Sequence, residues 1–306
     1  MNRFKMLSDK LISKVYRIAD DLQNIGLECK IRKYKKLLPK GFSTASVSYR
    51  DYLVICKLAV DHDDVFEVFK RVKDYRVELE HVSKKQGQLY LNIIKKEKSL
   101  LRYFSMFKEN DKFGCPVKYN YDVGIFSPTT LRYIKVLMDL KTFFGDLNNF
   151  NIVEIGVGYG GQCKIISDVF KQASYTMIDL YLTLLLAKKY LSKFNIQNVI
   201  YLTSQQIDNK KEYDLVISNY AFSEIEKSLQ DDYIQKILPF SKRGYLTCNY
   251  DGISTPNSPY NKEELFRMLS QRHSIEVVDE EPKTSRDNFI IKWDDEKTAR
   301  SNDLPL

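Results

Sequence analysis

Four glycines, Gly156, Gly158, Gly160 and Gly161, stand within six residues, directly after an apolar segment that contains Glu154. Glycine lets the backbone reverse tightly and approach a ligand closely, because no side chain stands in the way. Where such a turn opens a helix, the first backbone N–H groups of the helix are free to bind an anionic or polar ligand. We therefore expect these residues to cradle a nucleotide-like cofactor.

The same letters fit two cofactor patterns. Glu-x-Gly-x-Gly-x-Gly is typical of S-adenosylmethionine (SAM) sites, and Gly-x-Gly-x-x-Gly is typical of dinucleotide sites such as those for NAD. Asp179 follows the next predicted strand, 25 residues after Glu154, where a carboxylate can accept the hydrogens of both ribose hydroxyls. SAM and NAD both carry ribose, so this aspartate supports either cofactor. Ser204 and Ser218, at the ends of two further strands, are the other predicted cofactor contacts.

The predicted acceptor side of the site follows the fourth strand. Asn219 and Tyr220 stand there and are expected to orient the acceptor, and Glu224 comes early in the next helix. Ser-Asn-Tyr resembles the Asp/Asn-Pro-Pro-Tyr signature of amino-group methyltransferases, but both prolines are missing, so methylation of an amine is not indicated. We predict Glu224 as general base and Asp251, after the fifth strand, as second choice. The helix dipole explains Glu224 equally well, and a turn before Gly252 explains Asp251.

Arg132 lies in a predicted helix that begins at Ser127 and Pro128, a favoured N-cap and first helical residue, and ends at Gly145. Its guanidinium is suited to bind a phosphate or carboxylate on the acceptor through two parallel hydrogen bonds. An ion pair with a helix neighbour is an equally good explanation of this arginine.

Histidine, the usual general base, is scarce in this chain. His273 precedes the sixth strand, which puts it at the edge opposite the cofactor, and His62 and His81 fall in a helical region. The five cysteines are widely spaced and contain no Cys-x-x-Cys pair, so neither a disulfide framework nor a zinc site is indicated. The sequence requires no metal. Mg²⁺ would be compatible with it, although no clustered carboxylates demand the ion.

From residue 151 the apolar pattern alternates between strands and helices, which is typical of a parallel sheet with crossover helices. The predicted strands are 151–155, 175–178, 199–202, 215–218, 245–248, 275–279 and 288–293. The predicted helices are about 161–170, 182–194, 230–238 and 262–271. The last two strands are joined by only 280–287, which indicates an antiparallel pair. Seven strands ending in this way are the order of class I methyltransferases, whereas a dinucleotide-binding sheet usually ends in parallel strands.

The first hundred or so residues are helical in pattern and contain few glycines. Apolar stripes at three- and four-residue steps run through 7–22, 65–82 and 89–104. A segment rich in turn-forming residues, 110–116, marks the predicted boundary. We divide the chain into a helical region at 1–108, a Rossmann-like α/β domain at 109–295 and a tail at 296–306.

The formal charge of +8 is unevenly distributed. Residues 1–120 contain 26 Lys and Arg against 15 Asp and Glu, and the remainder contains 22 against 25. Because the basic residues alternate with acidic ones, as on a solvated helical face, no nucleic-acid partner is needed. No apolar run approaches the roughly 18 residues of a membrane span, and the charged N-terminus lacks the apolar block of a signal peptide. We expect a cytoplasmic protein, and a homo-oligomer is compatible with these features.

Several segments, in order along the chain, resemble the sugar O-methyltransferase family of bacterial surface-polysaccharide gene clusters. Examples are Asn-Asp-Lys-Phe-Gly-Cys-Pro at 110–116 and Ser-Asn-Tyr-Ala-Phe-Ser-Glu at 218–224, and the others lie at 127–133, 152–162, 174–180 and 243–249. The resemblance implies SAM as cofactor, S-adenosylhomocysteine as product and a carbohydrate hydroxyl as acceptor. That acceptor would be a nucleotide sugar, a lipid-linked glycan or a finished polymer.

The leading hypothesis is therefore an in-line transfer of the SAM methyl group to a sugar hydroxyl, with a base to remove its proton. Two alternatives stay open. One is an NAD-dependent sugar dehydrogenase that uses the same glycines, and the predicted terminal strand pair weighs against it. The other is a non-catalytic module of the same fold that docks through its basic helices, and the glycines, Asp179 and Glu224 weigh against that.

Overall fold

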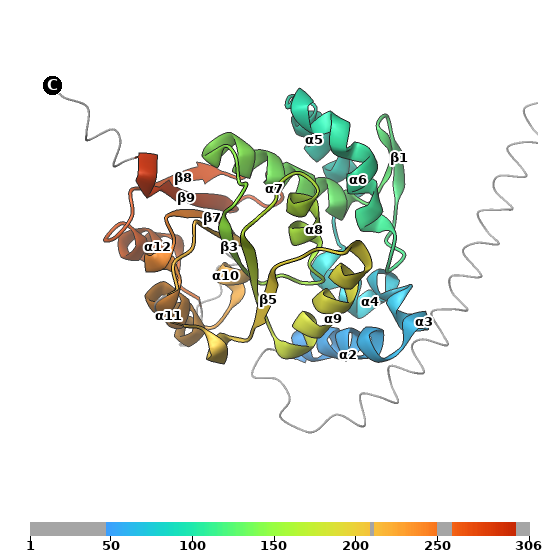
Figure 1. Ribbon diagram of the computed structural model, residues 1–306, viewed down its shortest axis with the longest axis horizontal. Helices are drawn as coiled ribbons and strands as arrows, with labels where there is room; N and C mark the ends of the chain where they lie inside the picture. Colours follow the sequence, from blue (N-terminus) through green and yellow to red (C-terminus); the bar gives the residue numbers. More distant parts are fainter. Residues whose placement is uncertain (1–46, 209–210, 250–258, 298–306) are drawn as a thin grey trace, which may run out of the picture.

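The computed structural model describes residues 47–208, 211–249 and 259–297 of the 306-residue chain. Its centre is one sheet of seven strands in the order β5-β4-β3-β6-β7-β9-β8 (Figure 1). The strands are β3 (Asn151–Ile155), β4 (Ser174–Ile178), β5 (Val199–Leu202), β6 (Leu215–Asn219), β7 (Arg243–Cys248), β8 (Ile275–Asp279) and β9 (Phe289–Asp294). All seven predicted strands are confirmed, and where their ends differ they do so by one or two residues.

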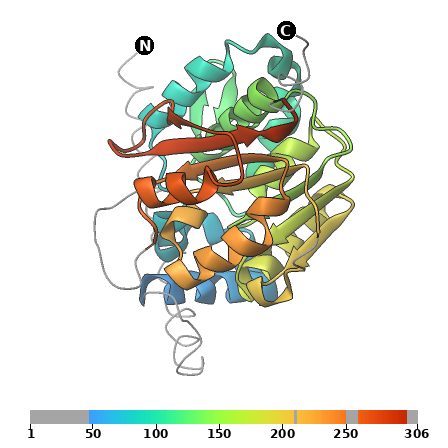
Figure 2. The ribbon, with the colours of Figure 1, turned by 90° about the vertical axis from the view of Figure 1, so that its left-hand side faces the viewer.

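The sheet combines parallel strands with one antiparallel strand. Strands β5, β4, β3, β6 and β7 pair in parallel, and β9 pairs antiparallel with β7 on one side and β8 on the other. In Figure 2 these two last strands are drawn in red. Strand β8 therefore points in the same direction as the parallel strands. The predicted α/β class with an antiparallel end is confirmed.

Strand β7 begins two residues earlier than predicted. Arg243 pairs in register with Asp294 of β9, and its guanidinium forms ion pairs with Asp294 at 3.2 Å and Glu296 at 3.0 Å. The sequence pattern missed this extension, because apolar alternation does not show a strand end that is held by charged side chains.

Alternate strand residues point to opposite faces of the sheet, and each face has its own apolar core. The face with Ile152 and Tyr245 packs under three helices, and the face with Val153 and Leu246 packs under three others. The first set is α7 (Pro128–Phe144), α8 (Gly161–Ser167) and α9 (Tyr181–Leu191), and the second is α10 (Ala221–Glu224), α11 (Lys227–Lys236) and α12 (Lys262–Leu269). The result is a three-layered α/β arrangement with helices on both faces.

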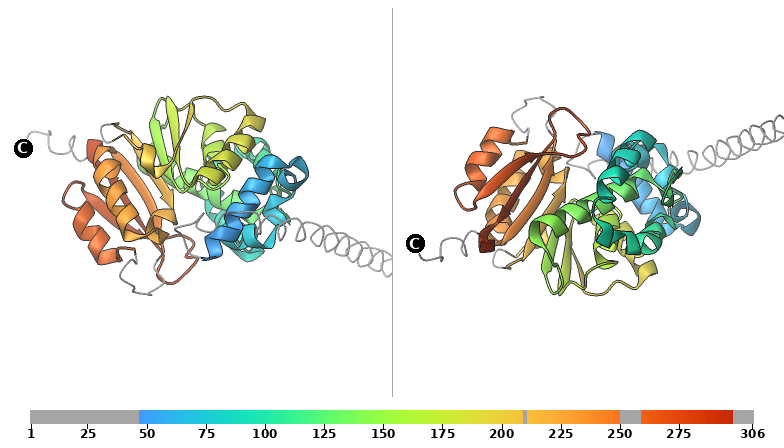
Figure 3. Two further views of the ribbon diagram at one scale, coloured as in Figure 1. Left: turned by 90° about the horizontal axis from the view of Figure 1, so that it is seen from below. Right: turned by 90° about the horizontal axis from the view of Figure 1, so that it is seen from above.

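From residue 47 on, where the structure describes it, the helical region before the sheet contains five α-helices. They are α2 (Val47–Asp61), α3 (Asp63–Phe66), α4 (Lys73–Leu79), α5 (Lys84–Ile94) and α6 (Phe104–Lys108), with 3₁₀ turns between them. Its buried residues, such as Phe66 and Leu91, belong to the same core as α7 and the first face of the sheet. Helix α2 packs along α9 and α5 along α7, at the end of the molecule away from α12 (Figure 3). The stripe predicted at 7–22 lies outside the described residues.

The segment 110–116, predicted as a boundary, joins the helical region to the α/β part. Asp111 is buried, and its carboxylate accepts hydrogen bonds from Ser127 N at 2.5 Å and from the hydroxyls of Ser127 and Thr130, both at 2.7 Å. Ser127 in turn caps α7, whose predicted start at Pro128 and end at Gly145 are confirmed. An unpredicted hairpin, β1 (Tyr119–Tyr121) with β2 (Gly124–Phe126), connects the two segments.

Candidate active site

The glycine turn links the carboxyl end of β3 to the N-terminus of α8. Gly156, Gly158 and Gly160 have φ angles of +77°, +53° and +85°. These are left-handed conformations, which a residue with a Cβ atom adopts only at an energetic cost. The turn therefore has the backbone shape that the sequence predicted, and it lies at the sheet edge where open α/β sheets bind ligands.

Two of these glycines also allow neighbouring helices to pack closely against the turn. A Cβ atom on Gly156 would stand 2.0 Å from the Cβ of Ala221 in α10, and one on Gly158 would stand 2.8 Å from Cδ1 of Leu79 in α4. Both separations are shorter than van der Waals contact allows. Helix α4 of the helical region thus lies against the turn on one side, and α10 on the other.

Asp179 is bound directly to the glycine turn. Its Oδ2 accepts hydrogen bonds from the backbone N–H groups of Val157 at 2.8 Å and Gly158 at 3.2 Å, and its Oδ1 accepts one from Leu180 N at 2.6 Å. Burial raises the pKa of Asp179 to about 6, although these three backbone donors oppose the rise. The carboxylate has room for a further donor, because two carboxylate oxygens offer about four acceptor positions.

Glu154 and Ser218 lie beside the turn with their polar atoms already bonded. The Glu154 carboxyl accepts a hydrogen bond from the Tyr175 hydroxyl at 2.8 Å, and burial raises the pKa of Glu154 to about 8. The Ser218 hydroxyl donates to Ile155 O and accepts from Phe222 N, both at 3.0 Å. Both side chains hold the strands and α10 in place around the turn. Ser204 is half-buried in the 3₁₀ turn that follows β5.

Asn219 and Tyr220 end β6 beside the glycine turn, where the sequence predicted the acceptor side. The Asn219 Oδ1 atom is buried and has no hydrogen-bond partner among the residues that the structure describes. Tyr220 has a φ of +69°, a strained conformation for a non-glycine residue that persists only where its surroundings enforce it. The Tyr220 hydroxyl donates to Glu280, and its ring lies 5.7 Å from the guanidinium carbon of Arg132. Arg132 and Tyr220, predicted separately, are thus neighbours.

Glu224 lies at the rim of this site. Its side chain is exposed, and its Oε1 accepts a hydrogen bond from Asn249 Nδ2 at 2.5 Å. Asn249 is fixed by Ser223, whose hydroxyl donates to Asn249 Oδ1 at 2.6 Å. Asp251, the second predicted base, lies outside the described residues.

Several buried polar atoms around the turn lack a hydrogen-bond partner among the residues that the structure describes. They are Tyr75 Oη, Glu80 Oε1, Tyr90 Oη, Arg132 Nε, Thr183 Oγ1 and Asn219 Oδ1. They come from α4, the residue after it, α5, α7, α9 and β6, which are the elements that converge on the glycine turn and Tyr220. Buried polar atoms in folded proteins are nearly always hydrogen-bonded, so such a group indicates the place of a polar ligand or of water.

Sequence reasoning missed Glu280, Tyr90 and Glu80. For Glu280 a signal was present, because this residue directly follows β8 and β8 runs parallel to β6 and β7. Its carboxyl end therefore reaches the edge where the predicted site residues lie. Tyr90 and Glu80 belong to the helical region, and no local pattern indicates which of its residues face the sheet.

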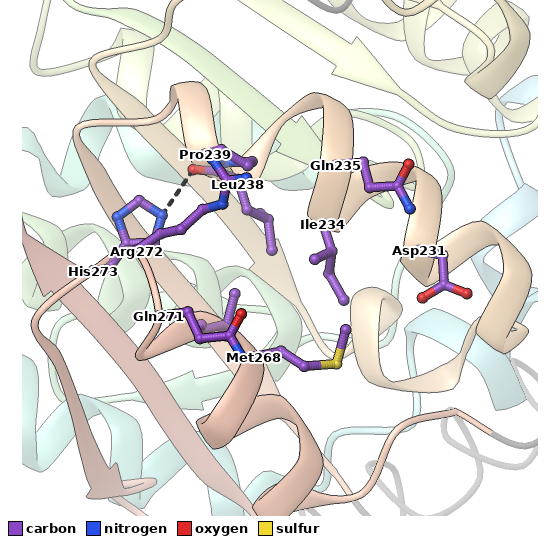
Figure 4. A pocket seen from close by; sticks show the side chains of 10 residues that line it. Asp231, Ile234, Gln235, Leu238, Pro239, Met268, Gln271, Arg272 and His273 are labelled. Carbon is purple, nitrogen blue, oxygen red and sulfur yellow. Dashed lines mark hydrogen bonds between the residues drawn. The ribbon is translucent and has the colours of Figure 1, made fainter.

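His273 lies away from this site, as predicted. Its ring nitrogens face Asp295 Oδ2 at 2.8 Å and Leu238 O at 3.1 Å, and the ring stacks on Trp293. It borders a cavity of about 260 Å³ between α11 and α12, in which Ile234 and Met268 also lie (Figure 4). Both ring nitrogens of His273 are thus bonded within the protein.

Within the described ranges, no group of three or more His, Cys, Asp or Glu side chains is arranged to hold a metal ion. The cysteines found there, Cys56, Cys115, Cys163 and Cys248, are free thiols. No helix in the same ranges is long and apolar enough to cross a membrane.

No protein-family model and no curated protein matches this chain. Solved structures do match about half of it. The N-terminal domain of EvdMO1, in the presence of S-adenosylhomocysteine and D-fucose, is 15% identical over 52% of this chain and 80% of its own, with a TM-score of 0.40. An rRNA methylase from Streptococcus thermophilus is 15% identical over 52% of this chain and 95% of its own, with a TM-score of 0.40. Magnesium protoporphyrin IX methyltransferase from Synechocystis, with bound SAM, is 12% identical over 54% of this chain and 83% of its own, with a TM-score of 0.41.

Proposed function

We propose that this chain is a SAM-dependent methyltransferase whose acceptor is a sugar hydroxyl in the assembly of surface glycans. The observation that carries the proposal is the direct bonding of Asp179 to the glycine turn at the carboxyl ends of β3 and β4. Open α/β sheets bind ligands at this edge. The antiparallel β9 favours SAM over NAD, because dinucleotide-binding sheets usually end in parallel strands.

The residues present fit a bound cofactor. The turn at Gly156, Gly158 and Gly160 would hold it by its backbone, Asp179 would accept the ribose hydroxyl hydrogens, and Ser204 would lie near the adenine. We assign supporting roles to Glu154 and Ser218, since their polar atoms are bonded within the protein. The unpartnered polar atoms around the turn support a bound polar group there. When bound, SAM supplies a methyl group on a positively charged sulfur.

On the acceptor side the protein has to orient a hydroxyl and remove its proton. Asn219, Tyr220 and Arg132 lie together there and would orient the acceptor, with the Asn219 Oδ1 atom open to a donor. A sugar hydroxyl is a weak nucleophile, and a positioned base contributes about 10²–10⁴-fold to such a reaction. Glu224 is the base that the sequence predicts, and Asp251 is its second choice. The carbohydrate acceptor itself, as a nucleotide sugar or lipid-linked glycan met in the cytoplasm, rests on the sequence resemblance.

Calorimetry tests the cofactor and separates the alternatives. We expect S-adenosylhomocysteine to bind and NAD not to bind. Binding of NAD alone would indicate the dehydrogenase, and binding of neither cofactor together with a stable protein partner would indicate a non-catalytic module.

Mass spectrometry of surface glycans from cells with and without the gene tests the acceptor. Loss of one methyl group from a sugar is the expected result. Unchanged glycans, in cells whose protein binds S-adenosylhomocysteine, would contradict the carbohydrate acceptor and leave the cofactor assignment intact.

A further inference from the structure

We propose that Tyr220 and Glu280 form the proton-accepting pair of the site, with Tyr220 in contact with the acceptor hydroxyl and Glu280 behind it. The inference rests on the proposed methyl transfer and deepens it. The pair joins the carboxyl end of β6 to the segment that follows β8, two places 60 residues apart in the sequence. It differs from the base that the sequence predicts, which is Glu224.

Glu280 is held in a fixed orientation. Only 5% of its surface is exposed, and its Oε2 accepts hydrogen bonds from Thr284 N at 3.1 Å, Thr284 Oγ1 at 2.7 Å and Asn288 Nδ2 at 3.0 Å. Its other oxygen, Oε1, accepts the hydrogen bond of the Tyr220 hydroxyl. Donors of Thr284 and Asn288, in the segment between β8 and β9, thus bind one carboxylate oxygen of Glu280. The other oxygen faces the Tyr220 hydroxyl.

The Tyr220 hydroxyl is placed to receive a proton. Because it donates its own hydrogen to Glu280, its oxygen keeps lone pairs that can accept a hydrogen bond from an incoming hydroxyl. The Thr284 hydroxyl stands 3.4 Å from the same oxygen. The charged or titratable groups that act on Tyr220 are Arg132, Glu280 and Tyr90. Among the described residues the Tyr90 hydroxyl and Arg132 Nε have no hydrogen-bond partner, so they offer polar atoms to an acceptor beside the pair.

The backbone places Tyr220 directly beside the glycine turn. Tyr220 is the residue before Ala221, whose Cβ lies where a side chain on Gly156 would stand. The Tyr220 N–H donates a hydrogen bond to Thr247 O at 2.8 Å, which helps to hold Tyr220 at its strained φ of +69°. Strain of this kind is retained where the surrounding structure enforces it, and such residues gather at active sites.

The acceptor oxygen forms a bond to the methyl carbon, the carbon–sulfur bond breaks, and its electron pair stays on sulfur, which becomes neutral. The acceptor proton passes to the Tyr220 oxygen while the Tyr220 proton passes to Glu280. Glu280 later releases its proton to solvent. Glu224 is less enclosed, since its side chain is exposed and bonded to Asn249.

The test compares Tyr220→Phe and Glu280→Gln with Glu281→Gln, an exposed neighbouring carboxylate that serves as the matched control. The acceptor probe is the glycan fraction extracted from cells that lack the gene, and the readouts are kcat and its pH profile. We expect both pair variants to lose about 100-fold or more in kcat, and Glu281→Gln to keep wild-type kcat. Glu280→Asp, which keeps a carboxylate, should partly restore the kcat that Glu280→Gln loses.

Binding of S-adenosylhomocysteine by each variant reports its fold and its cofactor site, and it should stay within about threefold of wild type. If Glu280→Gln does not fold, Tyr220→Phe still tests the pair, because it removes one oxygen and keeps the ring. Wild-type kcat and pH profile in Tyr220→Phe would overturn the pair and leave the methyltransferase proposal intact. Absence of cofactor binding in the wild-type protein would instead overturn the proposed function.

Discussion

Two buried polar clusters lie along α7, and they differ in how completely they are hydrogen-bonded. At the N-terminus of the helix, Asp111 accepts three hydrogen bonds from Ser127 and Thr130. Farther along, Arg132 lies beside Tyr133 and Tyr220, and within the described part of the chain neither its Nε nor the nearby Tyr90 hydroxyl has a hydrogen-bond partner. A polar cluster that bonds only to itself stabilises the fold, whereas one with open donors and acceptors can bind a ligand.

The first of these clusters joins segment 110–116 to α7 and to the glycine turn. Asn110 donates to Thr130 Oγ1 at 2.8 Å and to the Tyr159 hydroxyl of the glycine turn at 3.0 Å. The Tyr190 hydroxyl of α9 donates to the Asn110 backbone carbonyl at 2.8 Å. These hydrogen bonds connect the helical region, α7, α9 and the glycine turn, so the cluster supports the turn.

The largest expected effect comes from breaking the fully bonded cluster. Asp111→Ala removes the acceptor of three buried donors, and each buried donor left unpaired costs about 1–3 kcal/mol. We expect the free energy of unfolding in urea to fall by about 3 kcal/mol or more. Unchanged stability would show that the two clusters do not differ in the way described.

Glu154 resembles the fully bonded cluster, because its carboxyl group is buried and hydrogen-bonded within the protein. Its contribution to stability depends on pH. Burial raises the pKa of Glu154 to about 8 from its ordinary value of 4.5, so the folded state keeps a proton that the unfolded state has released. Stability from this group is therefore full below the unfolded value and is lost as the pH rises toward 8. Relative to Glu154→Gln, which does not titrate, the wild type should lose about 3 kcal/mol between about pH 5 and pH 8. Urea unfolding of both proteins at these pH values measures the difference, and parallel pH curves would contradict it.

Asp179 shares a feature with each cluster. Its carboxylate is hydrogen-bonded to the glycine turn, and it can still accept a hydrogen bond from a ligand. We expect Asp179→Asn to weaken S-adenosylhomocysteine binding by about tenfold, the loss of one hydrogen bond to a charged group. Burial raises the pKa of Asp179 to about 6, so wild-type affinity should fall as the pH drops through this value. Calorimetry at a series of pH values gives both results. An Asn variant with the wild-type pH dependence would assign that dependence to another group.

The smallest expected effect comes from the open cluster. Tyr90→Phe removes a buried hydroxyl for which the described residues supply no hydrogen-bond partner, so it should leave the stability of the free protein unchanged or raise it by up to about 1 kcal/mol. The same variant should weaken turnover if this hydroxyl contacts the acceptor. A marked loss of stability would show that the Tyr90 hydroxyl makes a hydrogen bond in the folded protein.

The sequence allowed the sheet and the glycine turn to be predicted because their signals are local. Apolar runs mark the strands, and glycine spacing marks the turn between β3 and α8. The contact between Arg132 and Tyr220 was not predictable in this way, because it depends on how α7 lies against the end of β6. Leu79 over Gly158 is a similar case, since a short helix with a simple apolar stripe gives no information on its partner.

The position of β9 between β7 and β8 has a consequence for the order in which the site assembles. Among the described strands, β8 has only β9 as a hydrogen-bonded neighbour in the sheet. Residues 275–279 are made before residues 289–294, so β8 can join the sheet only when β9 is available, whether β9 pairs first with β7 or with β8. The contact of Glu280 with Tyr220 therefore depends on β9, whereas the glycine turn and its bonds to Asp179 depend on β3 and β4. In a nascent chain the residues of the glycine turn and Asp179 are all present before the contact between Tyr220 and Glu280 can form.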